Sequence, residues 1–105
     1  MKNLRTQLFI NNQWVDSVAG ERFETVDPSN ETVIGTVSRA RAEDIDLAAR
    51  AASRAMQGPW PKLAPAERGK VLFKLADLID ANRHDLAKLE TIDVGKPLSG
   101  SLGDI

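Results

Sequence analysis

The sequence predicts an α/β chain in which β-hairpins come first and three helices follow. Apolar and polar residues follow a period of two up to about residue 37, whereas from about residue 42 apolar residues recur every three or four positions. A further helix starts near residue 99, and the sequence stops at Ile105 after barely one turn. We therefore expect an incomplete fold that needs more chain to bury its apolar faces.

Four short strand-like runs fill residues 7–37. Residues 7–10 and 14–15 flank Asn11 and Asn12, and asparagine tolerates the positive φ of a tight hairpin turn. Residues 23–26 and 32–37 flank a second turn, in which Pro28 fixes φ while Asp27 and Asn30 can hydrogen-bond nearby backbone. The pattern predicts two antiparallel hairpins, and isolated two-stranded ribbons need something to pack on.

A first helix is predicted from about Ala42 to the prolines at 59 and 61, which cannot continue it. Its apolar stripe consists of Ile45, Ala48, Ala49, Ala52 and Met56, and acids in its first turn complement the positive helix end, namely Glu43, Asp44 and Asp46. Arg41 stands where a serine or threonine cap is expected. The helix cap is therefore predicted to be weak or to come from elsewhere.

Two more helices complete the predicted helical region, residues 42–95. One begins at Pro65, a favourable first-turn residue, and runs to about Ala81 with a stripe of Leu72, Leu75, Ala76 and Ile79. Asn82 and Asp85 then predict an approximate capping box for a helix that Gly95 ends, with Leu86, Leu89 and Ile92 on its apolar face. Ser99 is predicted to cap the start of a truncated helix over residues 99–105.

Composition excludes several classes of function. The 105 residues carry 14 basic and 15 acidic side chains, a formal charge of −1, so no field holds nucleic acid or an anionic membrane. No apolar stretch reaches the roughly 20 residues of a membrane span, and we predict a cytoplasmic protein. Cysteine is absent, which excludes disulfides, thiolate metal sites and a thiol nucleophile in this chain.

Most catalytic templates are missing from the sequence. There is no glycine-rich phosphate loop after a strand, and His84, the only histidine, is predicted to face solvent. The aromatic residues could form a stacking surface for a ring, but we favour core plugs; they are Phe9, Trp14, Phe23, Trp60 and Phe73. No catalytic residue is assigned.

Glu90 and Asp93 share a helix face near the helix's negative end, so a cation is expected beside them. Lys96, Lys88 or Arg83 could supply that charge, and a bound monovalent cation is the alternative.

Six segments together resemble the N-terminal region of the aldehyde dehydrogenase superfamily. Their sequences are most similar to those of its betaine-aldehyde and general members. They are residues 9–14, 23–35, 43–48, Trp60, 65–69 and the run Leu-Glu-Thr-Ile-Asp-Val-Gly-Lys-Pro at 89–97. The resemblance implies that the α/β chain is the N-terminal part of a cofactor-binding domain. It also implies an enzyme that oxidises an aldehyde with NAD or NADP through a cysteine thiohemiacetal.

The resemblance further implies a homodimer or homotetramer when the polypeptide is complete, with the remainder of that polypeptide as the chain's partner. No position here matches the family's catalytic or cofactor-binding residues, so the chain alone is predicted to be inactive. Some betaine-aldehyde-type members bind potassium or sodium. By that likeness, Thr25 and Val26 carbonyls and the Asp93 carboxylate are candidate ligands, oxygen donors that hard cations prefer.

Two other functions stay open at this point. The chain could be a freestanding, non-enzymatic module that binds another protein through its apolar stripes. A stand-alone cation-binding domain is the weaker alternative.

Overall fold

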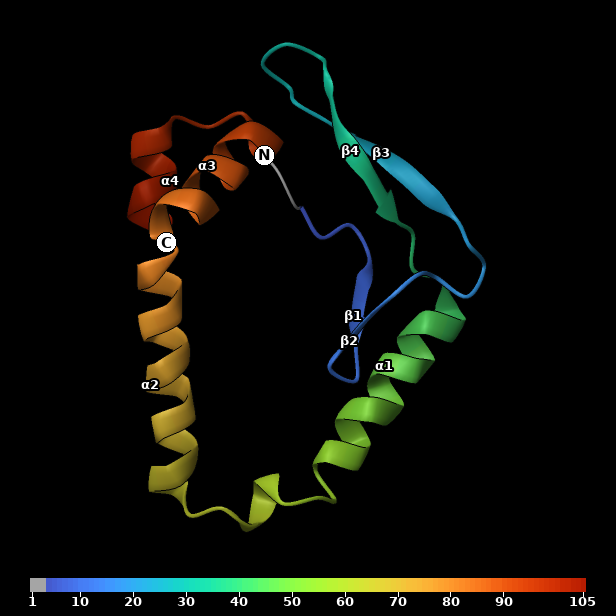
Figure 1. The fold of residues 1–105 in the computed structure, drawn as a ribbon, viewed down its shortest axis with the longest axis vertical. Coiled ribbons are helices and arrows are strands. Elements are labelled where there is room, and N and C mark those ends of the chain that lie inside the picture. Colours follow the sequence, from blue (N-terminus) through green and yellow to red (C-terminus); the bar gives the residue numbers. More distant parts are fainter. Residues whose placement is uncertain (1–3) are drawn as a thin grey trace. The chain divides into compact units, whose positions relative to one another are not determined.

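The computed structural model describes residues 4–105, which form four strands, four α-helices and one short 3-10 helix (Figure 1). The described chain divides into two compact units. The first comprises residues 4–25 and 35–62, and the second comprises residues 26–34 and 63–105. Strands therefore come first and helices follow, as the sequence predicts for this segment of an α/β fold.

The first hairpin pairs β1 (Leu8–Ile10) with β2 (Gln13–Val15) in antiparallel register, Phe9 opposite Trp14. Asn11 and Asn12 form the turn with φ angles of 52° and 60°, the left-handed values that asparagine tolerates. The predicted hairpin and its turn chemistry are confirmed.

The second hairpin joins β3 (Arg22–Val26) to β4 (Val33–Ser38). Its turn is held by Asp27, whose Oδ1 accepts hydrogen bonds from the Ser29 amide at 2.8 Å and the Ser29 hydroxyl at 2.6 Å. Asn30 Oδ1 likewise accepts from the Thr32 amide at 2.9 Å. Both side chains thus bond nearby backbone as predicted.

Helix α1 (Ala42–Ala55) lies against the first hairpin through a face of small residues. Ala48, Ala51, Ala52 and Ala55 line an apolar groove of about 390 Å³ together with Phe9, Ile10, Asn11 and Asn12. The predicted stripe was wrong for Ile45, Ala49 and Met56, which are exposed and do not line this groove. The alanine residues face the first hairpin because only short side chains let the helix approach the two strands closely. The 3-10 helix η1 (Trp60–Lys62) follows.

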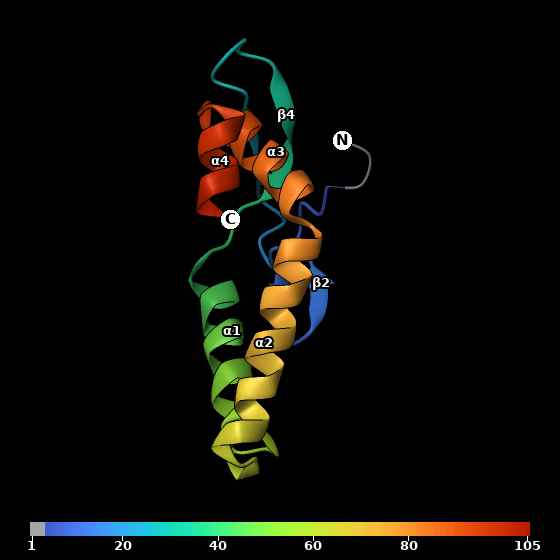
Figure 2. The ribbon, with the colours of Figure 1, turned by 90° about the vertical axis from the view of Figure 1, so that its left-hand side faces the viewer.

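The second unit contains α2 (Pro65–Ala81), α3 (Arg83–Val94) and α4 (Leu98–Asp104), which follow one another closely along the chain (Figure 2). Gly95 ends α3 in the left-handed conformation, φ 76°, as predicted. The predicted capping box at Asn82 was wrong, because the Asn82 side-chain amide donates backwards to the Leu78 carbonyl at 2.7 Å. The last helix begins at Leu98 after Pro97, without the predicted Ser99 cap.

Very little apolar surface is buried within the described residues. Ala87 is the only hydrophobic residue there that is fully buried. No residue of α2 is buried, and Phe73 is 77% exposed. The prediction that the aromatic residues plug a core was wrong for Phe9, Trp14, Phe23 and Phe73, which are exposed, whereas Trp60 is half-buried.

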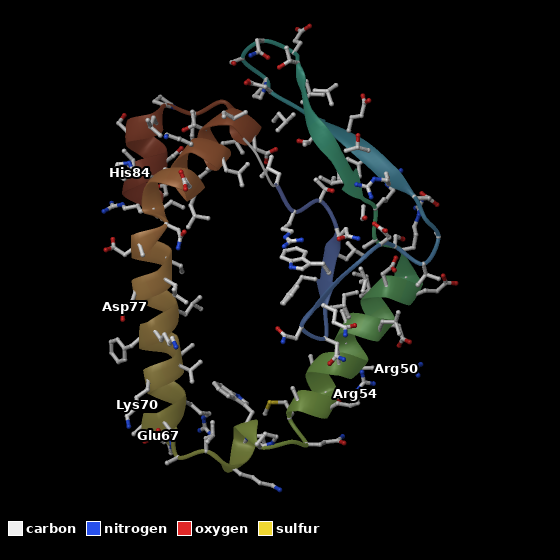
Figure 3. All side chains as sticks on the ribbon, in the orientation of Figure 1. Arg50, Arg54, Glu67, Lys70, Asp77 and His84 are labelled. Carbon is white, nitrogen blue, oxygen red and sulfur yellow. The ribbon has the colours of Figure 1, made fainter. Side chains whose placement is uncertain are left out.

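The polar side chains of α2 and the start of α3 project into solvent. Figure 3 shows Glu67, Lys70 and Asp77 along α2, and His84 at the first turn of α3. The solvent-facing position predicted for His84 is confirmed.

Candidate cation site and the pocket at the C-terminal end of α3

The three predicted cation ligands lie at the ends of two elements. Val26 is the last residue of β3 and belongs to the second unit, and Thr25 precedes it in the first unit. Asp93 lies in the last turn of α3, is exposed, and shares the second unit with Val26. Val26 and Asp93 are therefore placed within one compact body.

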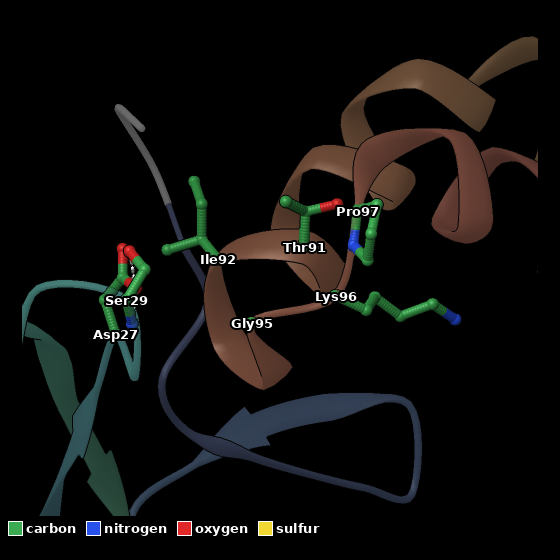
Figure 4. Close-up of a pocket in the computed structure, with 7 residues that line it drawn as sticks. All are labelled: Asp27, Ser29, Thr91, Ile92, Gly95, Lys96 and Pro97. Atoms are coloured by element: carbon green, nitrogen blue, oxygen red, sulfur yellow. Dashed lines mark hydrogen bonds between the residues drawn. The ribbon is translucent and has the colours of Figure 1, made fainter.

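A pocket of about 320 Å³ lies between the turn after Val26 and the end of α3. Asp27 and Ser29 line it from the turn, and the helix and its exit contribute Thr91, Ile92, Gly95, Lys96 and Pro97 (Figure 4). The Lys96 side chain points away from Asp27 and Ser29 (Figure 4). Hydrogen bonds from Ser29 hold the pKa of the Asp27 carboxyl below its ordinary value, so Asp27 carries a negative charge at neutral pH.

Glu90 has its positive partner within the chain. Lys96 Nζ donates to Glu90 Oε1 at 2.8 Å and also pairs with Asp104. Asp104 first, and Glu90 second, raise the pKa of the Lys96 ammonium above its ordinary value. Of the two explanations left open by the sequence, a lysine therefore holds for Glu90. Arg83 binds the Leu102 carbonyl instead.

The face of α3 that meets α4 differs from the apolar face read from the sequence. Arg83 Nε donates to the Leu102 carbonyl at 3.0 Å, and the Thr91 and Ser101 hydroxyls are 2.8 Å apart. Ala87 lies four residues after Arg83 and four before Thr91, so all three share one helix face, and Ala87 is fully buried. The contact is therefore built on a small residue between two polar ones, and Leu86 is left exposed.

Asp44 is the buried charged residue that the sequence did not single out. Its side chain is 1% exposed and accepts hydrogen bonds from the Ser17 hydroxyl at 2.8 Å, the Val18 amide at 2.9 Å and the Arg41 amide at 2.8 Å. The Arg41 and Val18 amides, followed by the Ser17 hydroxyl, lower the pKa of this carboxyl. One sequence signal could have indicated this role. Asp44 lies three residues after the N-cap residue Arg41, a position from which an acidic side chain accepts a hydrogen bond from the N-cap amide.

Within residues 4–105, no group of three or more histidine, cysteine or acidic side chains could hold a metal ion. A site made mainly of carbonyl oxygens is a different type of site. None of the described helices is both long and apolar enough to span a bilayer.

Comparison with known proteins identifies the family. The model of the aldehyde dehydrogenase family matches residues 14–105. Aldehyde dehydrogenase 1 of Tanacetum cinerariifolium is 53% identical over 93 residues, which cover 88% of this chain and 19% of that protein. The mitochondrial aldehyde dehydrogenase of Rattus norvegicus is 47% identical over 93 residues, covering 87% of this chain and 18% of that protein.

Solved structures agree with this relationship. A betaine aldehyde dehydrogenase variant from Staphylococcus aureus, crystallised with NAD+, superimposes with a TM-score of 0.93 at 38% identity, covering 97% of this chain and 21% of that one. PnpE in complex with nicotinamide adenine dinucleotide gives a TM-score of 0.90 at 41% identity, covering 95% of this chain and 20% of that one. The chain belongs to the aldehyde dehydrogenase family, and it spans about a fifth of the length of these relatives.

Proposed function

We propose that this chain is the N-terminal part of the cofactor-binding domain of an NAD(P)-dependent aldehyde dehydrogenase. The family match over residues 14–105 carries this proposal, and related structures bound to NAD support the cofactor. In the proposed reaction a cysteine thiolate attacks the aldehyde, hydride passes to the nicotinamide, and a glutamate activates water to hydrolyse the thioester. These 105 residues contain no cysteine, and the role we propose for them is structural.

The exposed apolar side chains of α2 support the proposal that this chain is part of a larger polypeptide. Leu72, Phe73, Leu75 and Leu78 are all more than half exposed. Exposed apolar side chains gathered along one helix normally mark an interface. The chain spans about a fifth of its relatives, and we propose that the remainder of the same polypeptide covers these side chains. The complete enzyme is proposed to be a cytoplasmic homodimer or homotetramer.

The chain alone is expected to show no NAD(P)-dependent aldehyde oxidation. A pure, mass-verified sample of residues 1–105 would be assayed for NADH or NADPH formation with aliphatic, aromatic and betaine aldehydes. Adding the separately expressed downstream part of the polypeptide, where the gene encodes one, is expected to restore turnover. Turnover by the chain alone would contradict the proposal. A monodisperse chain with strongly protected amides would instead favour the freestanding protein-binding module.

We also propose that potassium or sodium binds between the end of β3 and the end of α3. The Val26 carbonyl and the Asp93 carboxylate are the proposed ligands within the second unit, and Thr25 remains a predicted third ligand. Oxygen ligands suit a hard cation, and a helix C-terminus supplies free carbonyls and a negative dipole end. The contact of Pro28 with Gly95 supports the proposal, because it brings the turn after Val26 to this helix end.

Potassium is expected to stabilise the complete polypeptide that carries residues 1–105, and Asp93→Asn is expected to remove this effect. Replacing choline chloride by potassium chloride at constant ionic strength should raise the melting midpoint by roughly 2–6 °C. Asp77→Asn, which changes an exposed acid on α2, is the matched control and should keep the response. An equal potassium response in Asp93→Asn and the wild type would rule out the site.

A further inference from the structure

Gly95 brings the end of α3 unusually close to the second hairpin turn. A Cβ atom built on Gly95 would lie 2.7 Å from Pro28 Cγ, whereas non-bonded carbon atoms prefer about 3.5–4.0 Å. Gly95 also has a φ of +76°, the left-handed region that L-residues other than glycine rarely adopt. Gly95 therefore meets two separate demands: a left-handed backbone, and room for the proline ring.

The turn opposite Gly95 has little freedom to give way. The Pro28 ring fixes its own φ, and the Asp27 carboxylate holds the Ser29 amide at 2.8 Å and the Asn30 side chain at 3.3 Å. The Asp27 amide also donates to the Thr32 carbonyl at 2.8 Å, which closes the turn. A side chain at position 95 would therefore displace the turn as a whole.

We infer that Gly95 is a positioning residue whose missing side chain seats Pro28 on the C-terminal end of α3 and so fixes residues 26–34 to the helices of the second unit. The pocket between them has Asp27 and Ser29 on one side and Thr91 and Ile92 on the other (Figure 4). Its width depends on this contact.

The contact between Pro28 and Gly95 also affects cation binding, an inference that rests on the proposed function. Val26 directly precedes the turn, and Asp93 lies two residues before Gly95. The Pro28–Gly95 contact therefore sets the separation of the Val26 carbonyl and the Asp93 carboxylate, and with it the affinity for potassium.

A double-mutant cycle separates the steric role of Gly95 from its backbone role. Pro28→Ala removes Cγ and Cδ but keeps Cβ, which lies at an ordinary 3.6 Å from the built atom. Gly20→Ala is the matched control, because Gly20 has a φ of +68° and nothing within 4 Å of its built Cβ. Amide hydrogen exchange of the complete polypeptide that carries residues 1–105 would be measured for Gly95→Ala, Pro28→Ala, the double variant and the control.

Gly95→Ala is expected to speed exchange in residues 26–34 by roughly tenfold to a hundredfold, as overpacking does. In the double variant this segment should return to the rates of Pro28→Ala, while the end of α3 keeps an increase of about tenfold from the left-handed alanine. Gly20→Ala should leave residues 26–34 unchanged. If Gly95→Ala does not accumulate as folded protein, recovery of folded protein in the double variant makes the same comparison.

Strictly additive effects of the two substitutions, or failure of the double variant to recover, would overturn the positioning role. The potassium response is measured on the wild type and on these four variants, and it is expected to weaken in Gly95→Ala and to return in the double variant. If the exchange effects of the two substitutions are non-additive as expected but potassium does not stabilise the wild type, the cation proposal is refuted. The positioning role of Gly95 then still holds.

Discussion

Replacing Asp44 by alanine is expected to release the segment at residues 16–20 from the start of α1. Asp44 accepts hydrogen bonds from the Ser17 hydroxyl and from the Val18 and Arg41 amides, and alanine would leave all three donors without this acceptor. Hydrogen bonds to a charged acceptor are stronger than neutral ones. The Val18 and Arg41 amides should exchange roughly tenfold to a hundredfold faster, as measured by hydrogen exchange and NMR.

The same carboxylate gives the first unit a defined pH dependence. The pKa of Asp44 is lowered from 3.8 by the Arg41 and Val18 amides and then by Ser17. Because the folded pKa lies below the unfolded one, the stabilisation is present above about pH 3.9 and is lost as the pH falls through the folded value. Protection of the two amides should therefore show an acid step below about pH 4, which Asp44→Ala should lack.

Asp46→Ala is the matched control for both measurements. Asp46 lies two residues further along α1 and pairs with Arg50 at 2.8 Å in an exposed ion pair, a type that contributes little stability. The substitution should leave the Val18 and Arg41 amides unchanged. Equal effects of Asp44→Ala and Asp46→Ala would show that the buried network does not hold the segment at 16–20.

Ala87→Leu is expected to separate α4 from α3. Ala87 is fully buried on the helix face whose other members, Arg83 and Thr91, bind α4 through Leu102 and Ser101. Extra methylene groups in a filled contact typically cost about 1–3 kcal/mol. The buried Ser101 hydroxyl would then lose its partner Thr91, which adds to the cost.

Amide exchange of α4 and equilibrium denaturation would measure this effect. Lys88→Leu is the control, because it adds a leucine at the neighbouring, exposed position of the same helix. Lys88→Leu should stay within about 0.5 kcal/mol of the wild type. An Ala87→Leu protein with unchanged α4 exchange would mean that the two helices meet through another face.

The hydrogen-bonded turns and helix ends were the features most accessible to prediction. The left-handed turn at Asn11 and Asn12 and the stop at Gly95 follow from φ preferences of single residues. The starts of α1 and α2 follow from the change of period and from Pro65. These signals act over a few residues, so the sequence carries them without knowledge of the rest of the fold.

Helix faces were predicted less well, because amphipathic periodicity marks an apolar face without saying what covers it. On α2 the apolar residues are exposed, with Phe73 the clearest case. On α3 the contact with α4 uses Ala87 rather than Leu86. A small residue allows a closer approach between α3 and α4 than leucine would.

The sequence by itself determined the order of strands and helices, most of their ends, the second hairpin turn and membership in the aldehyde dehydrogenase family. Only the tertiary structure decided that Asp44 is buried beneath Ser17, that Ala87 faces α4, and that Pro28 lies on Gly95. The physical reason is the sequence distance over which each interaction acts. Backbone preferences are set by neighbours along the chain, whereas burial, shared hydrogen bonds and steric fit depend on residues brought together only by folding.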